Sequence, residues 1–265
     1  MGEIAFVGLG LSDERGLSER ARDALAAAQV VFAEEYTAVA VPGTLERLGR
    51  LLGHPVVRLD RPLLESEAPI LDALAAHPRV ALVVVGDPFA ATTHVALRLA
   101  AERAGHSWSY YPNASILTVA AGFLGLMQYR FGRAVSLPLP AERFAPTSPL
   151  ELIAANRERD LHTLVLLDLR PDEGRFLTAS TALALMRERD PAGHWLGDGD
   201  QLGVVARIGQ ESAAAFVGGF ARLRSVDFGP PMHTIVVFAP TLHFEEEAAV
   251  QRYRVPDDRP SDGPR

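Results

Sequence analysis

The sequence predicts an α/β fold built on a mostly parallel β-sheet, and two observations support that prediction. Over about the first 125 residues, short apolar runs alternate with amphipathic segments, as in chains of βαβ units. Residues 80–85 are apolar at every position, which is typical of a strand with both faces buried. This run stops at Gly86-Asp87-Pro88, since glycine permits a sharp turn and proline cannot donate to a sheet. In open α/β sheets, ligands bind outside the carboxyl ends of strands, so this loop is a candidate ligand edge.

The composition describes a globular chain that has neither cysteine nor lysine. Of its 265 residues 48% are hydrophobic, and no apolar run approaches the roughly 20 residues of a membrane-spanning helix. Without cysteine there are no disulfides, thiolate metal ligands or cysteine nucleophiles, and without lysine there is no Schiff-base or P-loop lysine. The net charge of −7 argues against a general nucleic-acid binder. No basic leader precedes the first strand, so we expect no signal peptide and a cytoplasmic location.

The amino-terminal segment is predicted to begin with a strand and a glycine-containing loop. Residues 4–7 are apolar and run into Gly8-Leu9-Gly10-Leu11, the start of a dinucleotide-binding fingerprint. Asp13 stands where the third glycine of that fingerprint belongs. The loop therefore indicates a close backbone approach to a ligand or to a neighbouring strand. Ser18 is expected to cap a helix that ends near Ala28.

The rest of the first half repeats this alternation. Further strands are predicted over residues 30–33, 56–59 and 108–111, and helices over 44–52, 70–76, 95–104 and 116–126. Thr92 or Thr93 is expected to cap the helix 95–104, and Ser115 the helix that follows the fifth strand. Glu34 follows the second strand, where an acidic residue can hold a ribose hydroxyl. We favour the interpretation of Glu34 and its neighbours as a solvated acidic turn.

The second half is predicted to be less regular. Because prolines and phenylalanines crowd together over residues 129–149, we expect a linker there, or a loop that covers a cleft, with a domain boundary between 128 and 135. Strands are predicted over 162–169, 202–208, 213–217 and 233–238, with Gly218-Gly219 as a turn. Helices are predicted over 150–159, from Thr178 as its cap to about 189, and over 244–253. The predicted domains are an N-terminal parallel-sheet domain (1–130), a C-terminal mixed-sheet domain (131–255) and a polar, disordered tail (256–265).

No familiar catalytic set is present. The sequence lacks a G-x-S-x-G elbow, an H-E-x-x-H helix and a P-loop, and its eight histidines are scattered singly, so no metal site is predicted. We interpret His162, His233 and His243 as packing or hydrogen-bonding residues. What remains is a set of loops at strand ends that supply backbone groups and apolar side chains. Such loops suit a site that binds a reactive cofactor by shape.

These loops make the chain similar to the diphthine synthase family, within the tetrapyrrole methylase superfamily of S-adenosylmethionine-dependent methyltransferases. The resemblance covers nearly the whole chain, to about residue 250. The motifs that carry it are Gly8-Leu9-Gly10-Leu11 with Asp13-Glu14-Arg15, Phe32-Ala33-Glu34 with Tyr36-Thr37, Gly86-Asp87-Pro88 with Ala91-Thr92-Thr93-His94, Pro112 with Ser115-Ile116, Phe144 with Pro146-Thr147-Ser148, Leu161-His162-Thr163-Leu164 with Leu167-Asp168, Ala206-Arg207 with Gly209, and Pro230-Pro231 before His233.

The resemblance implies two α/β domains with the cofactor, S-adenosyl-L-methionine, in the cleft between them. The family's cofactor contacts then fall on Leu11, Asp87, Ala90, Ser115, Ile116, Leu167, Ile208 and His233. Asp87 is expected to accept from cofactor donors or to face the positive charge of the cofactor. The sequence departs from the family pattern at Phe89-Ala90, at Ile208, where a small residue is common, and in the tail after Tyr253.

The implied reaction is methyl transfer to the amino nitrogen of a modified histidine on translation elongation factor 2, which forms diphthine in diphthamide biosynthesis and releases S-adenosyl-L-homocysteine. Because the sulfonium is already activated, such an enzyme needs alignment, desolvation and an unprotonated amine more than a strong base. No catalytic residue is assigned; Glu34, His94 and His162 are candidate bases by location alone. The resemblance also implies a homodimer and no membrane or direct nucleic-acid partner.

Three alternative functions remain open. The nearest is another methyltransferase of the superfamily that acts on a corrin, a porphyrin or ribosomal RNA, although the acidic net charge counts against RNA. A nicotinamide-dependent oxidoreductase is suggested by Gly8-x-Gly10 and Glu34, and the missing third glycine counts against it. The third alternative is a non-catalytic binding module that has kept the fold. The intact Gly-Asp-Pro and Pro-x-His loops argue against it, because such a module would not need them.

Overall fold

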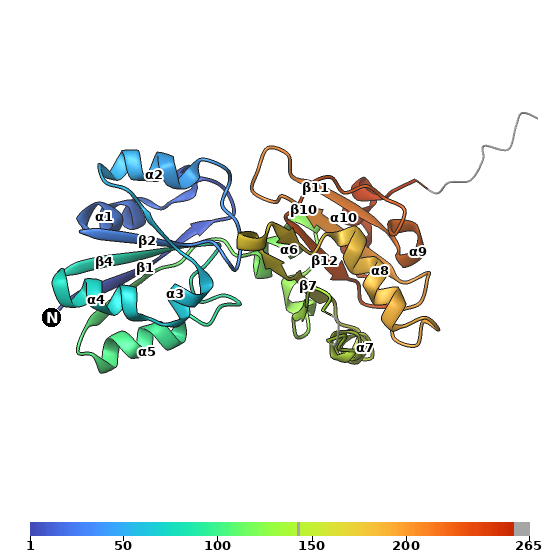
Figure 1. Ribbon diagram of the computed structural model, residues 1–265. Helices are drawn as coiled ribbons and strands as arrows, with labels where there is room; N and C mark the ends of the chain where they lie inside the picture. Colours follow the sequence, from blue (N-terminus) through green and yellow to red (C-terminus); the bar gives the residue numbers. More distant parts are fainter. Residues whose placement is uncertain (142–143, 257–265) are drawn as a thin grey trace, which may run out of the picture. The chain divides into compact units, whose positions relative to one another are not determined.

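The computed structural model describes residues 1–141 and 144–256, which divide into two compact units (Figure 1). The N-terminal unit contains residues 1–119 together with 169–175 and 208–211, and the C-terminal unit contains the remaining described residues. In the chain, the first change from one unit to the other falls inside helix α6 (Ile116–Leu124). The sequence-based domain limits stay a prediction, and all of the predicted tail except Pro256 lies outside the described residues.

The N-terminal unit is built on a five-stranded parallel sheet in the order β3-β2-β4-β1-β5. Its strands are β1 (Glu3–Gly10), β2 (Val30–Glu34), β3 (Val57–Leu59), β4 (Arg79–Val85) and β5 (Ser107–Tyr111). The apolar run predicted as a doubly buried strand is β4, which lies at the centre of the sheet between β1 and β2. The prediction of five strands in a parallel sheet is confirmed.

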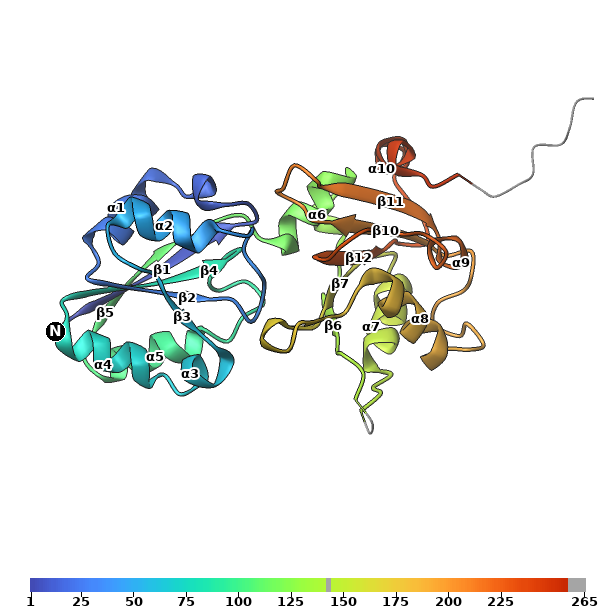
Figure 2. The ribbon, with the colours of Figure 1, turned by 45° about the horizontal axis from the view of Figure 1, so that its top comes forward.

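Helices cover both faces of this sheet (Figure 2). They are α1 (Glu19–Ala27), α2 (Thr44–Leu52), α3 (Arg61–Glu65), α4 (Ala68–Ala76) and α5 (Val95–Arg103). Successive residues of β1 alternate between two hydrophobic cores: Val7 packs with Leu25 of α1, and Phe6 packs with Ile70 of α4. The alternation follows from the two-residue period of a strand, and it explains why β1 and β4 are apolar at nearly every position.

Two of the three helix caps predicted in the first half of the chain are confirmed. Ser18 Oγ accepts from the Ala21 N–H of α1, and Ser115 Oγ accepts from the Leu117 N–H at the start of α6. The prediction for α5 is wrong, because its first flanking residue is His94 and no side chain caps it. Thr92 instead donates its hydroxyl to the carbonyl of Pro88 at 2.5 Å, so it stabilises the loop rather than the helix.

The C-terminal unit contains a mixed sheet in the order β11-β10-β12-β7-β6. Its strands are β6 (Val135–Leu137), β7 (Thr163–Leu167), β10 (Gln201–Ala206), β11 (Ala214–Gly219) and β12 (His233–Val237). Strands β6 and β7 pair in parallel, and the other three pairings are antiparallel. A separate two-stranded sheet joins β8 (Leu169–Arg170) to β9 (Arg175–Phe176).

Three predictions for this half of the chain need correction. The segment 129–149 is not only a linker, because β6 forms inside it and pairs with β7. The predicted strand 162–169 is interrupted at Asp168, whose Oδ2 accepts from the Leu139 N–H at 3.0 Å. Gly218-Gly219 is part of β11 rather than a turn, and Gly219 pairs with Gln201. In each case long-range pairing decides the conformation, which local composition does not reveal.

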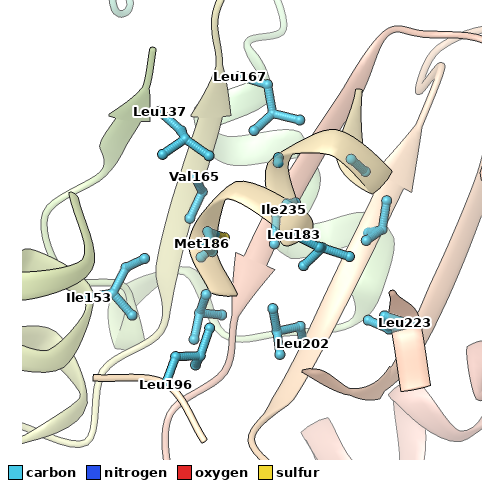
Figure 3. Packing of buried hydrophobic residues seen from close by; sticks show 14 of the residues in the cluster. Leu137, Ile153, Val165, Leu167, Leu183, Met186, Leu196, Leu202, Leu223 and Ile235 are labelled. Carbon is cyan, nitrogen blue, oxygen red and sulfur yellow. The ribbon is translucent and has the colours of Figure 1, made fainter. Parts of the chain in front are cut away.

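The core of the C-terminal unit lies between its sheet and its helices (Figure 3). These are α7 (Ser148–Arg157), α8 (Ala179–Arg189) and α9 (Phe220–Leu223), whereas α10 (Phe244–Val250) contributes no residue to this core. Leu183 and Met186 of α8 are fully buried in the same core as Val165 of β7 and Ile235 of β12. Thr178 caps α8 through Thr181 N, as predicted. This packing fixes the start of α8, where the Ala179 N–H donates to the ring of His233.

Candidate functional site

The loops predicted to bind a ligand in the N-terminal unit follow the carboxyl ends of its strands. Strands β1, β4 and β5 are hydrogen-bonded neighbours in parallel, so the segments that follow them leave the sheet at one edge. That edge is where open α/β sheets bind ligands. The loop after β4 is joined to the end of β1 by two backbone hydrogen bonds, Gly10 N to Gly86 O at 3.1 Å and Gly86 N to Gly10 O at 2.8 Å.

Gly86 leaves room for a ligand beside its backbone. Its φ of +82° lies in the left-handed region that favours glycine. An added Cβ would have no atom closer than the Ala114 carbonyl oxygen at 3.9 Å and Leu11 Cδ2 at 4.0 Å. A ligand can therefore approach the Gly86 backbone between Leu11 and the loop that follows β5. This cradle fits a cofactor bound mainly by shape and backbone groups.

Asp87 ties this loop to the end of β5. Its carboxylate is buried: Oδ1 accepts from Phe89 N at 3.0 Å, and Oδ2 accepts from Tyr110 Oη at 2.6 Å and from Asn113 N at 3.1 Å. Burial and the hydrogen bond to Asp87 raise the pKa of Tyr110 to about 12. A carboxylate has about four acceptor positions, and three are in use, so Asp87 keeps one for a ligand donor.

Asn113 holds the loop after β5 against the loop after β1. Its Nδ2 donates to the carbonyls of Gly8 at 2.9 Å and Gly16 at 3.0 Å, while its Oδ1 accepts from Ala114 N at 2.8 Å. Asn113 and Tyr110 are the two residues of this site that sequence reasoning did not single out by role. Their signal was position, since both lie at the carboxyl end of a predicted strand. Ser115 follows directly, at the start of α6.

The segment 208–211, which follows β10, also belongs to the N-terminal unit. Gly209 has a φ of +86°, and a Cβ there would lie 2.5 Å from the carbonyl oxygen of Leu11. Because only glycine permits that approach, the backbone of this segment rests directly on Leu11. Ile208 is buried beside it, at 8% exposure.

His233, in the C-terminal unit, has an unused hydrogen-bond donor. It is 7% exposed, and its Nδ1 accepts from Ala179 N, at the start of α8, at 3.1 Å. The proton of the neutral ring is therefore on Nε2, which makes no hydrogen bond of normal geometry to a described residue, although the backbone carbonyls of Phe228 and Pro230 act on the ring and oppose the lowering of its pKa. Burial, together with the charge of Arg207, lowers the pKa of His233, so the ring stays neutral. A buried N–H without a partner fits a ligand acceptor.

The predicted cofactor residues thus divide between the two units. Those in the N-terminal unit are Leu11, Asp87, Ala90, Ser115, Ile116 and Ile208. Leu167 and His233 belong to the C-terminal unit, where Leu167 is 8% exposed at the carboxyl end of β7. Ala90 is half-buried, and its N–H donates to the Asp87 carbonyl at 3.2 Å.

The interpretation of Glu34 as a solvated acidic turn is wrong. Glu34 is 1% exposed, because its carboxylate closes the turn that follows β2. Oε1 accepts from the N–H groups of Tyr36 at 2.6 Å and Thr37 at 2.5 Å, and Oε2 accepts the Thr37 hydroxyl at 2.8 Å. The Nε2 atom of the neighbouring His94 ring lies 3.7 Å from Glu34 Oε2.

His162 is a hydrogen-bonding residue, as predicted, rather than a base. It is fully buried; Nδ1 accepts from Ala239 N at 2.9 Å and Nε2 donates to Glu246 Oε1 at 3.1 Å. Burial lowers its pKa, so the ring remains neutral with both nitrogens engaged. His243 is also a hydrogen-bonding residue, since its ring accepts from Glu245 N at the start of α10.

Over residues 1–141 and 144–256, no group of three or more His, Asp or Glu side chains could hold a metal ion. Within the same residues, no helix is long and apolar enough to cross a bilayer.

Comparison with known proteins gives matches over most of the chain. Residues 3–221 match the tetrapyrrole (corrin/porphyrin) methylases. A diphthine synthase from Methanocorpusculum labreanum is 37% identical, with 94% of this chain and 98% of the relative covered. A diphthine methyl ester synthase from Emericella nidulans is 35% identical, with 95% of this chain and 94% of the relative covered. A crystal structure of a diphthine synthase superposes with a TM-score of 0.86 at 32% identity, covering 96% of each chain.

Proposed function

The chain belongs to the diphthine synthase family of tetrapyrrole methylases, and we propose that it methylates the amino nitrogen of a modified histidine on translation elongation factor 2. The product is diphthine, and the methyl donor is S-adenosyl-L-methionine. The observation that carries this proposal is the similarity to diphthine synthases over more than nine-tenths of both chains, in sequence and in fold.

The loops of the N-terminal unit support the cofactor part of the proposal. When bound, S-adenosyl-L-methionine supplies a methyl group on a sulfonium. Gly86 and Leu11 offer a cradle without a side chain in the way, and Asp87 is a fixed carboxylate with one acceptor position to spare. Ser115 and Ile116 lie at the start of helix α6, and the first N–H groups of a helix have no carbonyl partner inside the helix, so they suit a ligand acceptor.

The remaining predicted contacts supply apolar surface and one donor. We propose that Ala90, Leu167 and Ile208 contact the cofactor through their apolar side chains or backbone, and that His233 donates its Nε2–H to a cofactor acceptor. Because its ring is neutral and its tautomer is fixed by Ala179, this donor is oriented before the ligand arrives.

The chemical step needs little from side chains beyond positioning. Because bound S-adenosyl-L-methionine would supply a methyl group already activated by its sulfonium, a neutral amine of the substrate would need alignment from the protein rather than a strong base. This agrees with a site of backbone groups and fixed hydrogen bonds. We further propose a cytoplasmic homodimer that uses elongation factor 2 as its protein substrate.

A second candidate product is favoured by one relative. The Emericella nidulans protein is named for a methyl ester of diphthine, so an additional methylation of a carboxylate is the alternative outcome for this chain. The two products differ in alkali, because an ester is hydrolysed and a methylated amine is not.

The test is methyl transfer to elongation factor 2 that carries the aminocarboxypropyl histidine, with unmodified factor as the control. Mass spectrometry of the histidine peptide should show added methyl groups that need both the enzyme and S-adenosyl-L-methionine. Methyl groups that survive mild alkali support diphthine, and loss of one supports the ester. No mass gain on the modified factor, by a protein that binds S-adenosyl-L-homocysteine, contradicts the proposed substrate.

A further inference from the structure

Arg207 is the residue that follows β10, and its main chain is joined to the loop that leads into His233. Ala206, the last residue of β10, pairs with His233, the first residue of β12. The Arg207 N–H continues this pairing by donating to the Met232 carbonyl at 2.8 Å. Its φ of +49° is in the left-handed region, which is unfavourable for a residue with a Cβ. A conformation of this kind persists only where other interactions hold it in place.

The guanidinium of Arg207 binds main-chain carbonyls of the loop before β12. Nη1 donates to the Phe228 carbonyl at 3.0 Å and also to the Pro230 carbonyl, and Nε donates to the Ser212 carbonyl at 3.2 Å. Gly229 lies between the first two acceptors, and a Cβ there would be 3.3 Å from Nη1. Glycine at this position therefore leaves space for the guanidinium against the main chain. One side chain thus fixes the path of the loop.

Two of these carbonyls also act on the His233 ring. Those of Phe228 and Pro230 oppose the lowering of the His233 pKa, as acceptors near a ring N–H do. The Phe228 ring packs edge-on against the imidazole, with 6.1 Å between the ring centroids. Nevertheless, Nε2 of His233 makes no hydrogen bond of normal geometry to either carbonyl. Both carbonyls are therefore bonded to Arg207 and not to the histidine.

Arg207 is the stronger donor for these carbonyls. Its guanidinium is charged, and a hydrogen bond from a charged donor is roughly twice as strong as one from a neutral donor. The ring of His233 is neutral, because burial and the charge of Arg207 lower its pKa. A neutral imidazole N–H does not displace the guanidinium from both carbonyls. The Nε2–H therefore has no acceptor among the described residues, while Nδ1 is held by the Ala179 N–H.

We propose that Arg207 is a positioning residue that holds the Phe228 and Pro230 carbonyls and so keeps the Nε2–H of His233 available for an acceptor of the cofactor. The inference rests on the proposed function, because that acceptor is taken to belong to S-adenosyl-L-methionine. Arg207 acts through His233 and is assigned no contact with the cofactor or the substrate. Without the guanidinium, a released carbonyl would accept the Nε2–H, and a ligand would have to break that bond before it could use the donor.

The substitution Arg207→Gly tests this role without straining the main chain. Glycine adopts a φ of +49° readily, so the change removes the guanidinium and also removes a source of strain. The carbonyls of Phe228 and Pro230 then lose their charged donor. Because the lost side chain leaves space beside these carbonyls, free guanidinium ion at millimolar concentration should bind there and replace it.

A control and a double variant distinguish positioning from a general loss of structure. Arg187→Ala removes another guanidinium that donates to main-chain carbonyls of the same unit, those of Asp190 and Leu196. No predicted cofactor contact lies in that loop. The double variant, Arg207→Gly with His233→Asn, lacks the Nε2–H, so release of the carbonyls has no donor left to occupy.

The experiment is calorimetric titration with S-adenosyl-L-homocysteine at neutral pH, with circular dichroism as the check on folding. We expect Arg207→Gly to bind about tenfold more weakly than wild type, as for one lost hydrogen bond, and guanidinium ion to restore the affinity where potassium at equal ionic strength does not. Arg187→Ala should bind like wild type, with or without guanidinium. The double variant should bind no more weakly than His233→Asn alone. A folded Arg207→Gly that binds like wild type overturns the proposal, and so does a further loss of similar size in the double variant.

Proton and nitrogen NMR of the His233 ring tests the proposal without any cofactor, with the His233→Asn spectrum assigning the signals. The Nε2–H should move downfield in Arg207→Gly, because a released carbonyl accepts it. Identical Nε2–H signals in the two folded proteins overturn the proposal. Failure of folded wild type to bind S-adenosyl-L-homocysteine would instead contradict the proposed function, while the NMR comparison would still decide whether Arg207 keeps this donor available.

Discussion

Each unit of the molecule buries a glutamate beside a histidine, and the two pairs differ in how completely their atoms are hydrogen-bonded. In the C-terminal unit, Glu246 accepts from Met127 N, His243 N and His162, and it pairs with Arg130. In the N-terminal unit, Nε2 of His94 faces Glu34 without a hydrogen bond to any described residue.

The difference separates a structural network from a functional one. Buried polar groups that all have partners rigidify a fold, whereas a buried group left open needs an explanation such as a ligand or a labile proton. Two of the buried side-chain atoms that have no hydrogen-bond partner among the described residues are His94 Nε2 and His233 Nε2, and both residues lie in or beside the loops that family resemblance connects with the cofactor. The closed network around Glu246 contains none of the predicted cofactor contacts, and its histidine, His162, has both ring nitrogens engaged.

The largest effect should come from breaking the closed network. Glu246→Ala leaves Arg130 and two backbone N–H groups without their buried acceptor, and we expect a loss of about 3–5 kcal/mol in the free energy of unfolding. Glu247→Ala, on the exposed face of the same helix, should change it by less than about 0.5 kcal/mol. Urea unfolding measures both. Equal stability of the two variants would remove the basis of the comparison.

The same carboxylate gives a pH test. Although burial opposes its charge, hydrogen bonds from Met127 N and His243 N lower the pKa of Glu246 below its ordinary value of 4.5. The unfolded chain then takes up the proton first, so this contribution to stability is complete above pH 4.5 and is lost as the pH falls below it. Wild type should lose more stability than Glu246→Ala over that acid range.

A smaller effect should come from removing the Nε2–H of His233, a donor in the C-terminal unit without a hydrogen bond to any described residue. His233→Asn keeps an acceptor for Ala179 N and removes the Nε2–H, so affinity for S-adenosyl-L-homocysteine should fall about tenfold, as for one lost hydrogen bond. His194→Ala, at an exposed position of the same unit, is the control and should bind like wild type. Unchanged affinity of His233→Asn would show that the open donor is not used by the cofactor.

The smallest effect concerns Tyr110. Its pKa is raised from 10.0 to about 12, so the unfolded chain loses the hydroxyl proton first and stability falls as the pH rises between these values. Tyr110→Phe removes this alkaline loss and leaves Asp87 with its two backbone donors. Thermal unfolding against pH measures the difference, with the exposed Tyr129→Phe as control. Identical alkaline profiles for wild type and Tyr110→Phe would contradict the assigned hydrogen bond.

The sequence predicted those parts of the fold that depend on local pattern. The central strand β4 was recognisable because all six residues of 80–85 are apolar, and Ser18 and Thr178 were recognisable as caps. Strand β6 was missed because three residues among prolines form a strand only when β7 pairs with them. Glu34 was misjudged because its burial depends on the turn that it closes.

The sequence was sufficient to predict which loops form the candidate site, but not the hydrogen bonds that connect them. Asp87 could be named from its position after β4 together with the family motif. Its partners Tyr110 and Asn113 are 23 and 26 residues away, and only the pairing of β1 with both β4 and β5 places their strands at one edge. The open Nε2 atoms of His94 and His233 depend on tautomers that tertiary hydrogen bonds decide.

The most direct test of the central claim compares two glycines by calorimetric titration with S-adenosyl-L-homocysteine. Gly86 and Gly53 have φ values of +82° and +78°, and an added Cβ meets no atom within 3.8 Å at Gly86 and none within 4 Å at Gly53. Both alanine variants should therefore lose similar stability, about 1 kcal/mol. The account predicts that only Gly86→Ala fills ligand space and loses at least about tenfold in affinity. Equal affinities for the two folded variants would contradict a cofactor site at the carboxyl edge of the N-terminal sheet.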